Sequence, residues 1–189
     1  MKNVYEYCPQ FENEKFLLRL ISEEDTNDLL KVYSDVDAVP LFNSDNCNGD
    51  DFCYKTLERM KQAVDFWIFS YNERYFVRWT IIDKETKEAI GTIELFHREA
   101  DEHFYECGLL RLDLRSDYEN AGQIANIISL MEEATYDLFY CKLIATKAVP
   151  KATERLQALC ELGFVPAEKI MVGTDGSKYG DYYILENTR

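Results

Sequence analysis

The strongest constraint on the fold is a strand pattern that runs straight into a helix pattern over Phe104–Leu138. Leu110, Leu112 and Leu114 alternate with charged residues, which predicts a strand with one face in the core and the other in solvent. Apolar residues then recur at three- and four-residue spacing over Gly122–Leu138, which predicts one helix. The first N–H groups of such a helix lack backbone partners and lie at the positive end of its dipole. The segment therefore predicts a strand–turn–helix unit whose turn can bind phosphate.

The flanking segments complete an α+β pattern. Strand patterns lie at Phe16–Ile21, Tyr75–Ile82, Ile90–Phe96, Lys142–Val149, and from Phe164 onward with Tyr182–Leu185. Helix patterns follow the N-cap residue Ser22, extend from Cys53 to Ile68, and run from Pro150 to Gly163. The charged turn Asp83–Glu88 joins two strands as a hairpin, and Gly163 suits the left-handed residue that ends a helix. The order of elements indicates an α+β fold.

Length and charge restrict the kind of protein. The 189 residues suffice for a sizeable core, and we expect a single domain over residues 1–189. No apolar run approaches the roughly 20 residues of a membrane-spanning helix, and Met1–Tyr7 lacks a signal-peptide pattern, so we expect a cytoplasmic protein without a membrane partner. The formal net charge of −14 disfavours nucleic acid, because binding phosphates requires basic patches. This charge favours cationic partners or simply keeps the protein soluble.

Cysteine and histidine usage gives no sign of a metal site. The six cysteines contain no CxxC pair, and reduced, mostly buried thiols are the expected state. His97 and His103 have no second ligand at helical or CxxC spacing. We therefore expect no bound metal.

Six segments carry a recognisable family pattern. They are Phe16–Asp25, Ala89–Ile93, Glu106–Leu109, Leu112–Gly122, Glu161–Val165 and Asp175–Asp181. With them the chain resembles the GNAT superfamily of N-acetyltransferases, in particular the branch that acetylates ribosomal-protein N-termini and, in a related group, polyamines. The resemblance covers most of the chain and implies a GNAT-like α+β fold with helices on both faces of a mixed central sheet. It also implies acetyl-CoA as the cosubstrate and a primary amine as the acceptor.

The resemblance assigns the coenzyme contacts to the strand–turn–helix unit. The backbone of Leu112 and Leu114 would hydrogen-bond the pantetheine arm, and the amides of the turn would meet the phosphates. The predicted phosphate-binding residues are Asn120, Ala121, Gly122, Gln123 and Ile124. Of the family pattern Arg/Gln-x-x-Gly-x-Gly/Ala only Gly122 is kept, and Glu119 stands at the basic or neutral position. A carboxylate about 5 Å from a phosphate costs about 1 kcal/mol at a dielectric constant of roughly 60, so we expect weak binding or a Glu119 that points away.

Acetyl transfer requires a neutral amine, and an amine with a pKa of about 10.4 is only about one part in a thousand neutral at pH 7. Glu106 matches the position of the family's carboxylate base, and Glu94, with His97, is the second candidate. Burial near the sheet centre raises the pKa of a carboxyl group, which suits a base working near neutrality. Glu106 fits equally well as an ordinary hydrogen-bonded strand residue.

The family's usual partners of the leaving thiolate are missing. Counted back from Gly163, Leu159, Arg155 and Ala152 occupy the positions of the usual Tyr, Ser and Asn. Arg155 is either a coenzyme contact that stabilises the thiolate or a surface arginine. Because a thiol has a pKa of about 8.5, solvent can also supply the proton.

Two functions remain open from the sequence. Five aspartates follow the first predicted helix, near the segment that forms the acceptor wall in the family: Asp35, Asp37, Asp45, Asp50 and Asp51. They would attract a cationic amine, or they serve as caps and solvated loop residues. The first function is an N-acetyltransferase that acts on a protein N-terminus, a polyamine or a small amine. The alternative is a catalytically impaired GNAT-fold binding or regulatory module, and a homodimer is compatible with both.

Overall fold

The computed structural model describes residues 3–99 and 104–187, and a mixed sheet forms their centre. Eight strands pair in the order β1-β2-β3-β4-β5-β6-β10-β7, with β5 and β6 parallel and the other neighbours antiparallel. The strands are β1 Phe11–Glu12, β2 Phe16–Leu20, β3 Val77–Asp83, β4 Ala89–Arg98, β5 Cys107–Leu114, β6 Leu143–Lys147, β7 Val165–Pro166 and β10 Tyr182–Glu186. β8 (Met171–Val172) and β9 (Lys178–Tyr179) form a separate two-stranded ribbon.

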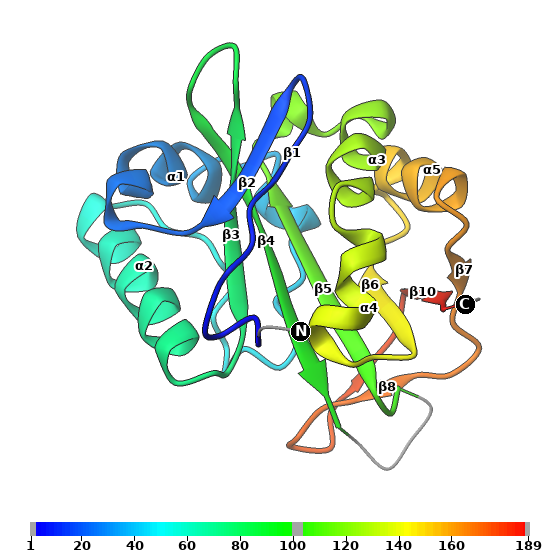
Figure 1. The fold of residues 1–189 in the computed structure, drawn as a ribbon. Coiled ribbons are helices and arrows are strands. Elements are labelled where there is room, and N and C mark those ends of the chain that lie inside the picture. The colour runs from blue at the N-terminus through cyan, green and yellow to red at the C-terminus, as the bar shows by residue number, and fades with distance from the viewer. Residues whose placement is uncertain (1–2, 100–103, 188–189) are drawn as a thin grey trace.

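Five α-helices cover the two faces of this sheet (Figure 1). They are α1 Thr26–Tyr33, α2 Leu57–Asn72, α3 Ala121–Ser129, α4 Glu132–Phe139 and α5 Thr153–Glu161. α1 and α2 lie on one side, and α3, α4 and α5 lie on the other. The expected mixed sheet with helices on both faces is confirmed. Within the described residues, no helix has the length and apolar content needed to cross a membrane.

Three helices differ from the sequence prediction. α5 begins at Thr153 rather than at Pro150. α2 begins at Leu57 rather than at Cys53, because the Thr56 hydroxyl oxygen accepts the N–H of Arg59 at 3.2 Å and caps the helix there. The predicted helix Gly122–Leu138 is instead two helices, α3 and α4.

The break between α3 and α4 lies at Leu130 and Met131. The N–H groups of these residues bond the carbonyls three residues earlier, at 3.3 and 3.2 Å, which tightens and ends α3. Met131 is fully buried, and α4 then begins with Glu132 and Glu133 in its first turn, where acidic side chains favour a new start. The apolar spacing continues across the break, which is why the sequence alone predicts one helix.

β5 has no solvent face. Leu110, Leu112 and Leu114 pack into the core as predicted, but Arg111 is only 8% exposed and Asp113 is fully buried. The prediction of a strand with one wet face is therefore wrong. Charged side chains are tolerated inside a protein only when they are paired and hydrogen-bonded, so the partners of this face decide its stability.

These partners come from the two preceding strands. The Glu94 carboxylate of β4 bridges two guanidinium groups, with Arg78 of β3 on one oxygen and Arg111 of β5 on the other at 2.6 Å. Arg78 Nη1 also donates to the Tyr33 hydroxyl of α1 at 2.8 Å and to Asp113 Oδ2 at 3.0 Å. We call these five residues the buried ion network. It joins three strands and a helix across one face of the sheet.

Three members of the buried ion network, Glu94, Arg78 and Arg111, are held in their charged state. Burial raises the pKa of Glu94, but the Arg78 and Arg111 guanidiniums outweigh this effect and keep that pKa below its ordinary value. Burial works against the charge of Arg78 and Arg111, and the carboxylates beside them nevertheless raise both pKa values. Glu94, Arg78 and Arg111 are therefore ionised throughout the neutral range.

The pairing between β5 and β6 ends in the middle of the sheet. Their pairing runs from Cys107 opposite Leu143 to Leu110 opposite Thr146, and it ends there. β5 continues through Leu114, so its last residues have no β6 partner on that edge. We call this unpaired edge of β5 the gap, and from it the chain leads into the start of α3, where the sequence places the phosphate-binding turn.

Gly91→Ala should destabilise the sheet. A Cβ at this position would lie 2.2 Å from the backbone oxygen of Asp113 and 3.0 Å from the Cα of Leu114, so β4 and β5 would have to separate. We expect a loss of about 2–3 kcal/mol in the free energy of unfolding, measured by urea denaturation. Gly180→Ala is the control, because a Cβ there meets nothing within 4 Å. Equal stabilities of the two variants would contradict the close approach.

Glu94→Gln should cost about 3 kcal/mol or more at pH 7, because two buried guanidiniums lose their shared carboxylate. The native carboxyl group has a lowered pKa, so its contribution is complete above the unfolded value of about 4.3 and disappears as pH falls through the folded value. The stability difference between native protein and variant should therefore shrink in acid. Urea denaturation at neutral and acidic pH measures it, with Glu12→Gln as control, because Glu12 is exposed and pairs with Lys84 at 2.8 Å. A difference that does not depend on pH would contradict the ionised network.

Candidate functional site

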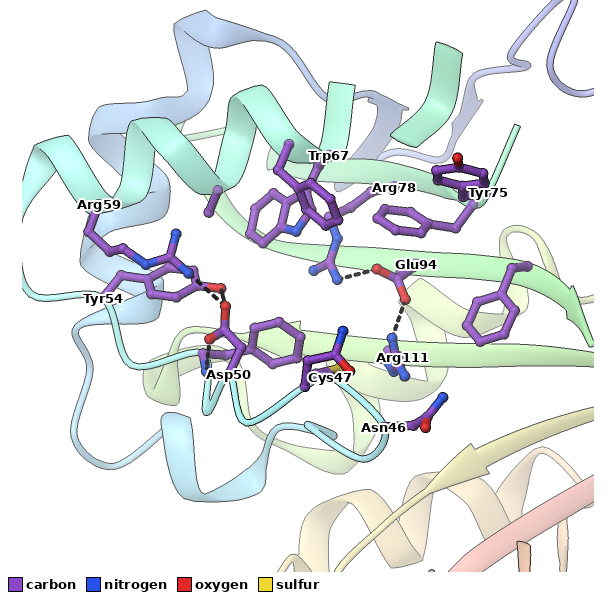
Figure 2. A pocket seen from close by; sticks show the side chains of 16 residues that line it. Asn46, Cys47, Asp50, Tyr54, Arg59, Trp67, Tyr75, Arg78, Glu94 and Arg111 are labelled. Atoms are coloured by element: carbon purple, nitrogen blue, oxygen red, sulfur yellow. Dashed lines mark hydrogen bonds and ion pairs between the residues drawn. The ribbon is translucent and has the colours of Figure 1, made fainter. Parts of the chain in front are cut away.

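A cavity of about 330 Å³ lies over the buried ion network, between α2, the Asn46–Tyr54 loop and strands β3 to β5 (Figure 2). Its walls are largely aromatic. The aromatic lining residues are Phe52, Tyr54, Phe66, Trp67, Tyr75, Phe76 and Phe96. Its polar lining includes the network members Arg78, Glu94 and Arg111, which converge on the cavity in Figure 2. An aromatic cavity with a few buried charged groups is the usual form of a small-molecule site, and we call it the aromatic pocket.

Arginine side chains of the protein already lie over several aromatic rings of the pocket. The guanidinium carbon of Arg78 lies 4.1 Å from the centre of the Trp67 ring, and that of Arg111 lies 5.5 Å from the Phe96 ring. Arg59 of α2 lies 4.3 Å from the Tyr54 ring. These distances fall within the range of cation–π attraction.

The acidic residues near the pocket are also engaged. Asp50 accepts from Arg59 at 2.6 Å and from the Tyr54 hydroxyl at 2.9 Å (Figure 2). Asp45 accepts from Lys147 at 2.7 Å, and its backbone carbonyl accepts from Arg111 Nη2 at 2.8 Å. The expected acidic cluster is therefore bound by the chain's own cations at these two positions.

The gap between β5 and β6 is filled by one side chain of α5. Arg155 Nη1 donates to the Leu112 carbonyl at 2.7 Å, and Arg155 is only 4% exposed. Its Nε also donates to the Glu119 carboxylate at 3.0 Å. The surface-arginine interpretation of Arg155 is therefore wrong, and Glu119 does not point into solvent. The structure does bring Arg155 and Leu112 together, as their joint assignment to the coenzyme site requires.

The amides at the start of α3 have acceptors from within the chain. The Asn120 side chain caps the helix by accepting the Gln123 N–H at 3.1 Å, and Glu154 Oε2 of α5 accepts the Ala121 N–H at 2.8 Å. A Cβ at Gly122 would meet only Asn120 Oδ1, at 3.9 Å, so the turn itself has room. A carboxylate thus lies where the sequence predicts a phosphate. The turn does not fit a coenzyme pyrophosphate while Glu154 holds this position, and the Leu112 carbonyl in the gap is already bonded to Arg155.

The remaining predicted coenzyme residues, Leu114 and Ile124, have buried side chains in the core between β5 and α3. The assignment of Leu114 concerns its backbone. For Ile124, the side chain packs inward at the position of the family's second small residue. Their coenzyme contacts stay predictions.

The two predicted bases lie in different places. Glu94 lines the aromatic pocket, where its lowered pKa makes it a weak base. Glu106 lies just before β5 with a φ of 51°, and its carboxylate pairs with Lys142, which lowers its pKa. It lines a separate hollow with His97 and Tyr140. The structure does not bring Glu106 to the gap or to the aromatic pocket, and a base role for either residue stays a prediction.

Most residues of the pocket are not predicted from the sequence, among them Arg78, Arg111 and Trp67. For the two arginines, the sequence contains a weak signal of burial. Each stands inside an apolar strand segment, and a charged residue flanked by core residues is a candidate for a buried pair. For Trp67, the sequence indicates only a place on the apolar face of a helix.

Within the described residues, no group of three or more His, Cys, Asp or Glu side chains could hold a metal ion.

Comparisons with known proteins agree on the fold. An uncharacterised N-acetyltransferase of Bacillus subtilis (strain 168), YoaA, is 26% identical over 95 residues, which are 50% of this chain and 49% of YoaA. This match spans about half the length of that relative. The ribosomal-protein-S5-alanine acetyltransferase of Vibrio fischeri aligns with a TM-score of 0.62 and 19% identity, over 93% of this chain and 94% of its own.

RimL, a ribosomal L7/L12 α-N-protein acetyltransferase solved in complex with coenzyme A, aligns with a TM-score of 0.67 and 12% identity. The alignment covers 94% of this chain and 98% of RimL. At such identities the structural likeness is evidence of the fold alone. The family model for the acetyltransferase (GNAT) domain matches residues 15–165, which is most of the chain. The chain therefore belongs to the GNAT acetyltransferase family.

Proposed function

We propose that the protein transfers an acetyl group from acetyl-CoA to a primary amine of a small molecule that lies in the aromatic pocket. One observation carries the proposal. Arg111 lines the pocket, and the next residue of β5, Leu112, turns its carbonyl into the gap between β5 and β6. An acceptor in the pocket and an extended acyl carrier in the gap would therefore meet at the same point of β5. Family membership supports acetyl transfer as the reaction.

The charge and burial of the pocket can increase the neutral fraction of an amine that binds there. Its lining carries Arg59, Arg78 and Arg111 against the carboxylates of Asp50 and Glu94. Nearby positive charge and burial both disfavour a protonated amine, so they lower the pKa of an amine that is bound there. The more neutral amine that results is the form that attacks a carbonyl carbon. On this view no dedicated side-chain base is required, and water takes the proton.

The second candidate is a binding module that has the fold without the transfer reaction. It is favoured by the contacts of Glu119, Glu154 and Arg155, which occupy the gap and the start of α3. In this case the aromatic pocket binds its ligand and no acetyl group moves.

Thiol release separates the two candidates. The protein is incubated with acetyl-CoA and a panel of primary amines, free thiol is followed with a thiol-reactive dye, and the acetylated product is identified by mass. Release that depends on one class of amine supports transfer. Absence of release with every amine, from the native protein and from the Glu154→Ala variant below, would reject transfer in favour of the binding module.

Glu154→Ala should strengthen acetyl-CoA binding by about fivefold to tenfold. The variant frees the Ala121 N–H and removes one carboxylate beside the expected phosphates, which is worth about 1 kcal/mol. Isothermal titration calorimetry measures the dissociation constant. Glu161→Ala is the matched control, because Glu161 lies exposed on the same helix and contacts Gln157. If both variants bind coenzyme like the native protein, Glu154 does not guard a phosphate position.

A further inference from the structure

The aromatic pocket is poorly suited to a cationic ligand, although the sequence suggested one. A cationic amine or polyamine is usually held by aromatic faces and by free carboxylates. Here the guanidiniums of Arg59, Arg78 and Arg111 already lie over Tyr54, Trp67 and Phe96. A second cation at these rings would meet like charge at close range.

The carboxylates of the pocket offer little to a cation either. Both oxygens of Glu94 accept from guanidiniums, one from Arg78 and one from Arg111. Asp50 Oδ2 accepts from two side chains, and its Oδ1 accepts the Phe52 N–H at 2.9 Å. Each oxygen of the lining carboxylates therefore already accepts at least one hydrogen bond from the protein.

Within the described residues, the buried side-chain atoms of the pocket lining that have no hydrogen-bond partner are both donors. Arg111 spends one bond from Nη1 on Glu94 and one from Nη2 on the Asp45 carbonyl, although each of these nitrogens carries two hydrogens. Its Nε is buried and has no partner among the described residues, and the same is true of Arg78 Nε. The Arg111 side chain is 9% exposed and lines the pocket. A buried donor without an acceptor is costly, and a ligand that supplies the acceptor removes that cost.

We propose that the aromatic pocket recognises an aromatic α-amino acid or a close analogue, that is, a small molecule with an aromatic ring, a primary amine and a carboxylate. The carboxylate lies against the donor edge of the Arg111 guanidinium, and the flat apolar part lies among the aromatic walls. The guanidinium fork suits a carboxylate because it presents parallel N–H groups. A cavity of about 330 Å³ is at the lower end for ligand sites, which favours a single small molecule.

This inference rests on the proposed function only for the amino group, which would be the acetyl acceptor. Carboxylate recognition is a binding property and holds for either candidate function. It is therefore tested without coenzyme, so that its failure is distinct from a failure of acetyl transfer.

Three ligands that differ by one group each provide the test: phenylalanine, phenethylamine, which lacks the carboxylate, and 3-phenylpropionate, which lacks the amine. Binding to the native protein is measured by calorimetry. We expect the two carboxylates to bind about tenfold more tightly than phenethylamine, the factor for a hydrogen bond to a charged group. Phenethylamine binding as tightly as phenylalanine, or no binding of phenylalanine and 3-phenylpropionate, would overturn the proposal.

Two variants assign the effect to Arg111. Arg111→Leu should abolish the preference for carboxylates, and Arg111→Lys, which retains the charge without the fork, should restore only part of it. Arg74→Gln is the control, since Arg74 is exposed and pairs loosely with Glu6 at 3.9 Å. A full preference in Arg111→Leu would overturn the assignment. If that variant does not fold, Arg111→Lys and the three-ligand comparison on the native protein still decide the question.

Discussion

The shared carboxylate of Glu94 is the interaction on which the rest of the structure depends. It holds Arg78 of β3 and Arg111 of β5 on either side of β4, and through Arg78 the contacts reach Tyr33 on α1 and Asp113 on β5. Charges this deep are stable only as a complete set. The network therefore fixes how β3, β4 and β5 lie relative to α1, and at the same time it forms the polar lining of the aromatic pocket. Stability and ligand recognition use the same side chains.

β5 separates two chemically different sites. The Arg111 side chain of β5 presents guanidinium donors to the aromatic pocket. The backbone edge of β5 at Leu112 faces the gap beside β6. The pocket is complete as the structure stands, but the gap and the start of α3 are occupied by Arg155 and Glu154. Under the proposed function, the pocket can take its ligand as it stands, whereas coenzyme phosphates could approach the turn only after a local rearrangement of side chains.

Periodicity and turn chemistry predict much of the fold. The hairpin around Asp83–Glu88, the strand–turn–helix unit and the left-handed Gly163, with a φ of 86°, are all local features that short segments specify. The buried face of β5 was mispredicted because alternation of Leu with Arg and Asp cannot show that the charges meet partners on β3 and β4. The same holds for the site. Gly122 marks the turn, yet the carboxylate that caps it comes from 33 residues further on, and no pattern in the turn reveals it.

The side chains that close the gap, Glu119, Glu154 and Arg155, make up a small group that is separate from the buried ion network. Two of them are neighbours in sequence on α5, and none contributes to the face of the sheet that holds the network together. In evolutionary terms, the passage between a closed and an open coenzyme site is therefore short. A few point substitutions on α5 and the turn could therefore open or close the proposed coenzyme site, while the sheet and the aromatic pocket descend unchanged.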